Sequence, residues 1–163
     1  SDDKSVFTGD VEGRISELSL EQGNVTILVT HTSALNSLVV VESLQRIFAL
    51  DVEGNVVAWD LKDGSRIMLE SAHSSSTSSL IVTPDSASLI SASIDGKLIV
   101  WDPQSMTRSK EFDIKHGGVH SLHHGMTDRT LFLGYADGTV ELWDYTTDES
   151  VFTLHGHHGR VTA

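Results

Sequence analysis

The sequence predicts an all-β protein built from a unit repeated about every 42 residues. The phrase Gly-x-x-x-x-Trp-Asp occurs three times, with its tryptophans at Trp59, Trp101 and Trp143. Short β-branched and aliphatic runs alternate with Gly, Asp, Asn and Ser, and no stretch keeps a helical period over several turns. Such a fixed period indicates a repeat architecture in which each copy buries its neighbour's face.

Each apolar run bounded by turn residues predicts one strand. The expected strands cover residues 5–9, 14–20, 24–30, 35–41, 46–50, 56–61, 65–71, 77–83, 88–93, 98–102, 107–114, 118–123, 130–135, 139–145 and 149–155.

Tight turns with a positive φ at glycine are expected between paired antiparallel strands, at Glu53-Gly54, Asp95-Gly96 and Asp137-Gly138. The stretch Asp10-Val11-Glu12-Gly13 has the same form as Asp51-Val52-Glu53-Gly54. The first unit therefore belongs to the series, although Leu18 and Ser19 stand where later units have Trp-Asp.

A histidine recurs in step with the tryptophans, because His31, His73, His116 and His157 each precede a short gap and a strand. With its His, Asp-Gly and Trp-Asp markers in register, the sequence resembles the WD40-repeat family over essentially its whole length. The resemblance implies a β-propeller of four-stranded antiparallel blades.

In that family a buried relay of Trp, Ser or Thr, His and Asp fastens the blade, and the indole N–H requires an acceptor. Carried onto the third unit of this chain, the relay comprises Trp101, Ser93, His73 and Asp95. It would fix the turn within the blade to the loop that leads into the blade.

The other units match only part of this pattern. The second has His31 and Trp59, but Asp51 replaces the serine and Glu53 the aspartate. The fourth has His116, Asp137 and Trp143, with Tyr135 at the serine position. We expect partial networks there, and structural rather than catalytic roles, because these residues follow the period of the fold.

The repeat markers divide the chain into blades. We expect a partial blade at 1–30, whole blades at 31–72, 73–115 and 116–156, and the first strand of a closing blade at 157–163. WD40-like rings usually have about seven or eight blades. The chain is therefore expected to be part of a longer propeller, or half of a dimeric eight-bladed ring, rather than a ring closed on its own four blades.

The formal net charge is −12, from 11 basic and 23 acidic residues. This excess of acid disfavours nucleic acid or an anionic membrane as the ligand and favours proteins or peptides with basic surfaces.

No apolar run approaches the length of a membrane helix, so we expect no membrane insertion. The absence of cysteine fits a reducing compartment, and we expect an intracellular protein, cytoplasmic or nuclear.

Nine histidines raise the question of a metal site. Strand alternation places His120 and His124 on one face and His123 on the other, so these three do not converge. His155, His157 and His158 lie near the C-terminal turn, where they could chelate adventitious metal. We expect neither a biological metal site nor a cofactor.

The polar run from Ser74 to Ser79 has two interpretations. It is a loop leading into an inner strand with small side chains, or a phosphorylation or contact loop on the propeller face.

The sequence favours a non-catalytic protein–protein interaction scaffold in a multiprotein complex, since no nucleophile elbow or phosphate-binding glycine loop appears. The alternatives are a substrate-recruiting adaptor of a ubiquitin ligase and, less favoured, a hydrolase on a propeller scaffold. In this family the turns within blades and the loops that lead into them often bind the partner. The corresponding candidate contacts are Glu53, Asn55, Ser75, Lys97, Gly118, Thr139 and Arg160.

Overall fold

Short strands joined by turns make up nearly all of the computed structural model, which describes residues 4–162. The strands are β1 (Ser5–Gly9), β2 (Arg14–Ser19), β3 (Val25–Thr30), β4 (Leu35–Val41), β5 (Arg46–Asp51), β6 (Asn55–Asp60), β7 (Arg66–Ser71), β8 (Thr77–Val82), β9 (Leu89–Ser93), β10 (Lys97–Asp102), β11 (Thr107–Asp113), β12 (Val119–His124), β13 (Thr130–Tyr135), β14 (Thr139–Asp144) and β15 (Glu149–His155).

These bounds agree with the expected strands to within about a residue or two. The sequence did not predict the single-turn 3-10 helix Glu42–Leu44 between β4 and β5. It ends at Gln45, whose φ of 52° reverses the chain into β5. No helix within the described residues is long and apolar enough to cross a membrane.

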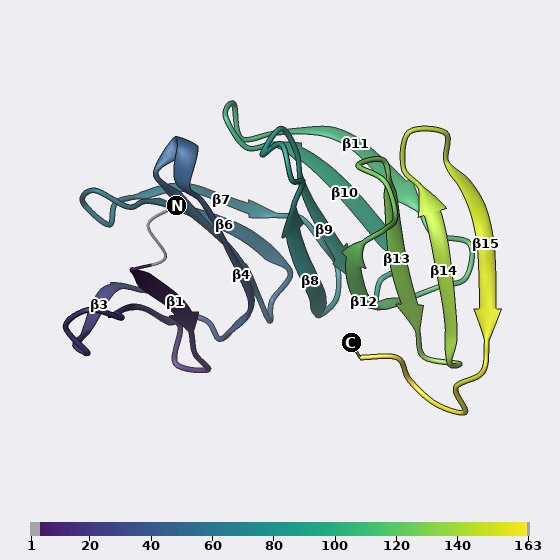
Figure 1. The fold of residues 1–163 in the computed structure, drawn as a ribbon, viewed down its shortest axis with the longest axis horizontal. Coiled ribbons are helices and arrows are strands. Elements are labelled where there is room, and N and C mark those ends of the chain that lie inside the picture. The colour runs from purple at the N-terminus through teal and green to yellow at the C-terminus, as the bar shows by residue number, and fades with distance from the viewer. Residues whose placement is uncertain (1–3, 163) are drawn as a thin grey trace.

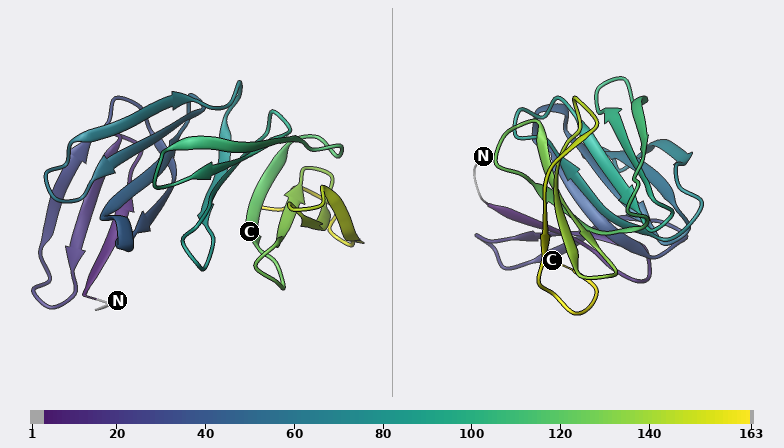
Figure 2. Two further views of the ribbon diagram at one scale, coloured as in Figure 1. Left: turned by 90° about the horizontal axis from the view of Figure 1, so that it is seen from above. Right: turned by 90° about the vertical axis from the view of Figure 1, so that its right-hand side faces the viewer.

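The strands form four consecutive antiparallel sheets, which confirms the predicted fold class of about four antiparallel blades. Strands β1–β2–β3 make a three-stranded sheet, and β4–β7, β8–β11 and β12–β15 make four-stranded sheets in chain order. The sheets follow one another along the molecule from the N-terminal to the C-terminal end (Figure 1). The views in Figure 2 show the same succession, and the described residues close no ring.

Each tryptophan packs its own blade against the preceding one. Trp59 shares a core with Ile15, and Trp101 shares one with Val56 and Ala58. Trp143 likewise packs with residues of the preceding sheet, where its ring meets Phe112 edge-on at 4.8 Å between centroids. The innermost strand β8 also adjoins the innermost strands β4 and β12 of the two neighbouring blades. The core is thus a series of layers between blades rather than one central cluster.

Glycines at the turns within blades let the next loop approach closely. The N–H groups of His31 and His73 donate to the carbonyls of Gly13 (2.8 Å) and Gly54 (2.9 Å). Gly54 has a φ of 96°, and a Cβ on it would lie 2.3 Å from the carbonyl oxygen of His73. Only glycine accepts both the left-handed backbone and this contact. We call this contact between a turn glycine and the following loop the joint. It connects each turn to the loop that leads into the following blade.

The C-terminal segment 156–162 is irregular, but it repeats the approach to an inner strand. The N–H of Val161 donates to the carbonyl of Tyr135 at 3.0 Å. Leu35, at the start of β4, makes the equivalent bond to Asp10 at 3.2 Å. Val161 therefore occupies the position from which a further inner strand would start.

Candidate functional site

The third blade contains a buried polar relay centred on Ser91. The indole N–H of Trp101 donates to Ser91 Oγ at 3.0 Å, and His73 Nε2 lies 2.9 Å from the same oxygen. All three residues are buried. Ser91 can accept from Trp101 while donating to His73, which places the imidazole proton on Nδ1. The relay thus links strands β9 and β10 to the loop before β8.

The remaining member, Asp95, accepts a hydrogen bond from the loop at Ser74 but makes no short hydrogen bond to the imidazole of His73. Its Oδ2 lies 3.4 Å from His73 Nδ1, without the alignment of a hydrogen bond. Burial would raise the pKa of Asp95, but the backbone N–H groups of Ser74 and Lys97 hold that pKa below its usual value. Burial lowers the pKa of His73, although Asp95 opposes the shift. His73 therefore stays neutral beside an ionised carboxylate.

The sequence assignment of Ser93 to this relay is wrong. Ser93 Oγ donates instead to the carbonyls of Ser75 (3.3 Å) and Ser76 (2.9 Å), and it accepts the N–H of Asp95 at 3.2 Å. Alternation puts Ser91 and Ser93 on the same face of β9, so sequence spacing does not separate them. Ser91 is the one within reach because it pairs with Ile99, which lies two residues before Trp101 on β10, and Ser93 lies two residues further from that pair.

The second blade replaces the relay with a direct histidine–carboxylate contact. Ala49 stands opposite Val57, where the third blade has Ser91, and His31 Nε2 instead contacts Asp51 Oδ2 at 3.0 Å. The edge of His31 meets Trp59 at 5.7 Å between ring centroids. Asp51 Oδ1 also accepts the N–H groups of the following turn. A partial network, as expected, replaces the full relay here.

The fourth blade departs further from the pattern. His116 and Asp137 are exposed, so neither takes part in a buried relay. The ring of His116 instead packs on Tyr135 at 5.2 Å between centroids. Tyr135 donates its hydroxyl proton to the buried carboxylate of Glu141, a residue that the sequence analysis did not single out. The first blade, with Leu18, has no tryptophan to anchor a relay.

The candidate contact loops do gather at one end of each blade. Gly54 lies against the loop carrying Ser75, and Gly118 approaches the carbonyl of Ile94 beside the next turn. Glu53 and Arg160 are exposed, and Asn55, Ser75, Lys97 and Gly118 are half-buried. Thr139 is 3% exposed, with its Oγ1 3.3 Å from His155 Nδ1, and this removes it from a contact surface.

The serine run is largely occupied by contacts within the fold. The N–H of Ser74 donates to Asp95, Ser78 Oγ donates to the carbonyl of Ala92, and Ser79 Oγ donates to Leu122 of the neighbouring inner strand. These bonds favour the loop-and-inner-strand interpretation.

A register shift between Val119 and Ser121 falls at His120, so simple alternation does not place His120 relative to His124. His123 and His124 keep consecutive pairing, opposite Phe132 and Leu131, and both side chains are exposed. Within residues 4–162, no three His, Asp or Glu side chains are grouped to hold a metal ion.

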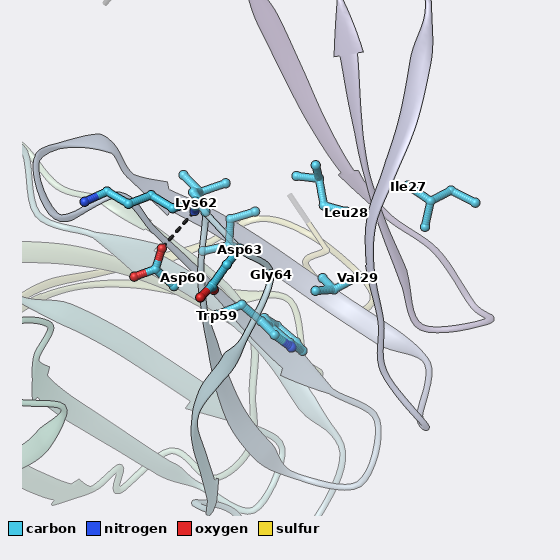
Figure 3. A pocket seen from close by; sticks show the side chains of 10 residues that line it. Ile27, Leu28, Val29, Trp59, Asp60, Lys62, Asp63 and Gly64 are labelled. Atoms are coloured by element: carbon cyan, nitrogen blue, oxygen red, sulfur yellow. Dashed lines mark hydrogen bonds between the residues drawn. The ribbon is translucent and has the colours of Figure 1, made fainter.

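Hollows lie between successive blades. One of about 190 Å³ separates β3 from the turn after β6, where Leu28, Val29 and Trp59 supply apolar walls (Figure 3). Asp60 and Lys62 belong to that turn, and the N–H of Lys62 donates to Asp60 Oδ1 at 2.8 Å. A smaller one of about 80 Å³ lies between the third and fourth blades and reaches Glu141 and Trp143.

The fold and the relay define a repeat protein of the β-propeller class, with about four blades. Residues 64–102, from β7 through β10, match the family model of the WD domain, G-beta repeat. One WD40 repeat is thus matched directly, and four-stranded blades of the same antiparallel form precede and follow it in the structure.

A solved structure shares the fold: the crystal structure of the computationally designed Ika8 protein aligns with a TM-score of 0.80 at 22% sequence identity. The alignment covers 99% of this chain and 49% of the designed one, so this chain spans about half of that protein's length. No curated protein sequence matches the chain.

Proposed function

We propose that the chain is a non-catalytic protein–protein interaction scaffold of a multiprotein complex. The observation that carries this proposal is the repeated joint between each turn glycine and the following loop, as at Gly54 and His73. The joint holds loops of variable sequence on one rigid face, and binding residues commonly lie on loops that a rigid scaffold positions.

The polar groups of the blades support binding rather than chemistry. His31 and His73 are buried and engaged in bonds that hold their own blades together. WD40 propellers are generally non-catalytic, and the hydrolase alternative would require a reactive cluster at the mouth of the channel. We therefore do not assign the chain an enzymatic activity.

The contact face is proposed to include Glu53, Asn55, Ser75, Lys97, Gly118 and Arg160. The net charge of −12 favours partners with basic surfaces over nucleic acid. A cytoplasmic or nuclear location belongs to the same proposal, as does completion of the ring by another chain or by further sequence.

The open ends of the row of blades support ring completion. Within residues 4–162, no strand pairs with the free edge of β1 in the first sheet, and the segment at Val161 is placed to begin an inner strand. Beside Val161 an open hollow of about 320 Å³ is lined by Phe132, Gly134 and Val140 on the outer face of the last blade. Another blade packed there would cover this face.

Affinity purification from cell extract tests the scaffold proposal. The tagged wild type is compared with Glu53→Ala/Arg160→Ala, which alters the proposed face, and with Lys110→Ala/Glu149→Ala, which alters exposed outer strands. We expect specific partners with the wild type and the outer-strand variant, and fewer with the face variant. Equal recovery by all three folded proteins would contradict the proposed face.

The same experiment addresses the alternatives. Recovery of ubiquitin-ligase subunits together with their substrates would favour the adaptor. An activity screen against esters and phosphates addresses the hydrolase, and turnover there would contradict a non-catalytic role.

A further inference from the structure

Glu141 breaks the repeat at a buried position. The corresponding residues of the second and third blades are Val57 and Ile99, both 0% exposed, whereas Glu141 is a carboxylate at 6% exposure. A buried carboxylate is costly unless a partner compensates it. The fourth blade therefore carries a polar group where its neighbours need only an aliphatic side chain.

Only half of this carboxylate is satisfied within the described residues. Tyr135, which is 1% exposed, donates to Oε2. Burial, followed by the contact with Glu141, raises the pKa of Tyr135, so the phenol remains a neutral donor. The hydrogen bonds and ion pairs found in residues 4–162 include no partner for Oε1. Since Oε1 is not among the fully buried unpartnered atoms, it is open to solvent and can accept a hydrogen bond from a group outside the chain.

The 80 Å³ pocket gives this carboxylate an opening between the third and fourth blades. Its buried surface is formed by Glu141, Trp143 and Ile114. Its exposed rim comes from the segment after β11 and from the start of β15. Three carboxylates line the pocket, against one lysine and one histidine: Asp113, Glu141 and Asp148, with Lys115 and His116.

We propose that this pocket receives the ammonium end of a lysine side chain from a partner protein. The ammonium would donate to Glu141 Oε1 beside the indole of Trp143, and a cation next to an aromatic ring gains further attraction. The volume suits a compact group, since a water molecule occupies about 30 Å³ in the liquid. This inference deepens the proposed scaffold function, because it assigns one anchor point for a basic partner.

The titration of the isolated chain with n-butylammonium tests the pocket without any partner protein. The indole N–H of Trp143, assigned with Trp143→Phe, is followed by ¹⁵N-edited NMR. We expect a saturable shift with n-butylammonium and none with the neutral n-butanol. Glu141→Gln keeps the shape of the side chain and should weaken binding at least about tenfold, through loss of the charge-assisted bond. Unchanged indole signals of Trp59 and Trp101 would show that this variant remains folded.

Matched variants separate the pocket from general charge effects. Glu42→Gln removes the same charge from an exposed position between β4 and β5 of the second blade, away from the pocket, and should leave the affinity unchanged. Asp113→Asn/Asp148→Asn removes rim charge and should weaken binding several-fold. Three results would contradict the proposed binding of an ammonium group in the pocket. They are equal affinity of Glu141→Gln and the wild type, an equal response to n-butanol, and no response at about 100 mM amine. A positive titration combined with failed partner recovery would leave the pocket intact and contradict the scaffold proposal.

Discussion

At the scale of single residues, the hydroxyl of Ser91 is the centre of the hydrogen-bonded relay in the third blade. It is the common partner of His73 Nε2 and Trp101 Nε1, so its hydroxyl satisfies two buried groups at once. An unpaired buried polar group costs about 1–3 kcal/mol. The side chains that fasten a blade are therefore a small set in which one hydroxyl serves two neighbours.

Ser91→Ala should lower the free energy of unfolding by about 2–4 kcal/mol, because it leaves both ring nitrogens without a partner. Chemical denaturation followed by tryptophan fluorescence measures the change. Ser150→Ala, on the exposed strand β15, is the matched control and should shift stability by less than about 0.5 kcal/mol. If the two variants were equally stable, the relay would have no energetic role.

His73 should make the protein less stable as the pH falls. Burial lowers its native-state pKa below the usual 6.5, so the unfolded chain binds a proton in a range where the native protein does not. Stability must then fall as the pH drops below about 6.5, because the unfolded state takes up more protons there. Burial lowers the pKa of His120 as well, which adds to the same trend.

Denaturation of the wild type at pH 7.5 and 5.5 should show this loss. His73→Gln should reduce the dependence on pH, with a residual slope from His120. A slope unaffected by His73→Gln would mean that this imidazole does not resist protonation.

At the scale of elements, the turn within each blade is also the joint to the next one. Gly54 contacts the loop before β8. Gly138 is similarly close to the next loop, because a Cβ added to it would lie 2.2 Å from the carbonyl oxygen of His157. The turn chemistry thus fixes the spacing of successive blades as well as the pairing of two strands.

Gly54→Ala should be more destabilising than Gly117→Ala. Both glycines have a positive φ, 96° and 94°, and so share a backbone cost of about 1–2 kcal/mol. A Cβ at Gly54 also meets the carbonyl of His73, whereas nothing lies within 4 Å of one at Gly117. We expect an additional loss of about 1–3 kcal/mol for Gly54→Ala in unfolding experiments. Equal losses of unfolding free energy in the two variants would show that the loop at His73 moves away from the added Cβ without an energetic cost.

At the scale of the whole molecule, both ends of the row of blades leave surfaces that a closed ring would cover. Unpaired strand edges and bare faces favour association. We therefore expect the isolated 163-residue chain not to behave as a stable, monodisperse monomer in light scattering.

Val161→Asp tests which surface drives this association. Val161 is 8% exposed and lies on the face beside Gly134, so a charge there should weaken association. Val151→Asp places the same charge on the outer strand β15, at a side chain 55% exposed, and should not change association. A monodisperse wild-type monomer would exclude the predicted association altogether.

Much of the fold could be predicted from the sequence because its signals are local. Apolar runs and turn residues fixed the strands, and the positive φ at Gly54, Gly96 and Gly138 follows from the Asp-Gly and Glu-Gly turns. The period of the Trp-Asp phrase then identified the blades. Less of the site could be predicted, because a polar contact depends on distances across strands and between blades.

The sequence by itself determined the strands and their grouping into repeated blades, since both follow from periodicity along the chain, and its recurring His, Asp-Gly and Trp-Asp markers carried the resemblance to WD40 repeats. Only the tertiary structure decided that Ser91 rather than Ser93 accepts from Trp101, that Thr139 is buried, and that Glu141 reaches a pocket between blades. Strand alternation tells which face a side chain occupies, but the distance to its partner is set by the register and packing of neighbouring sheets.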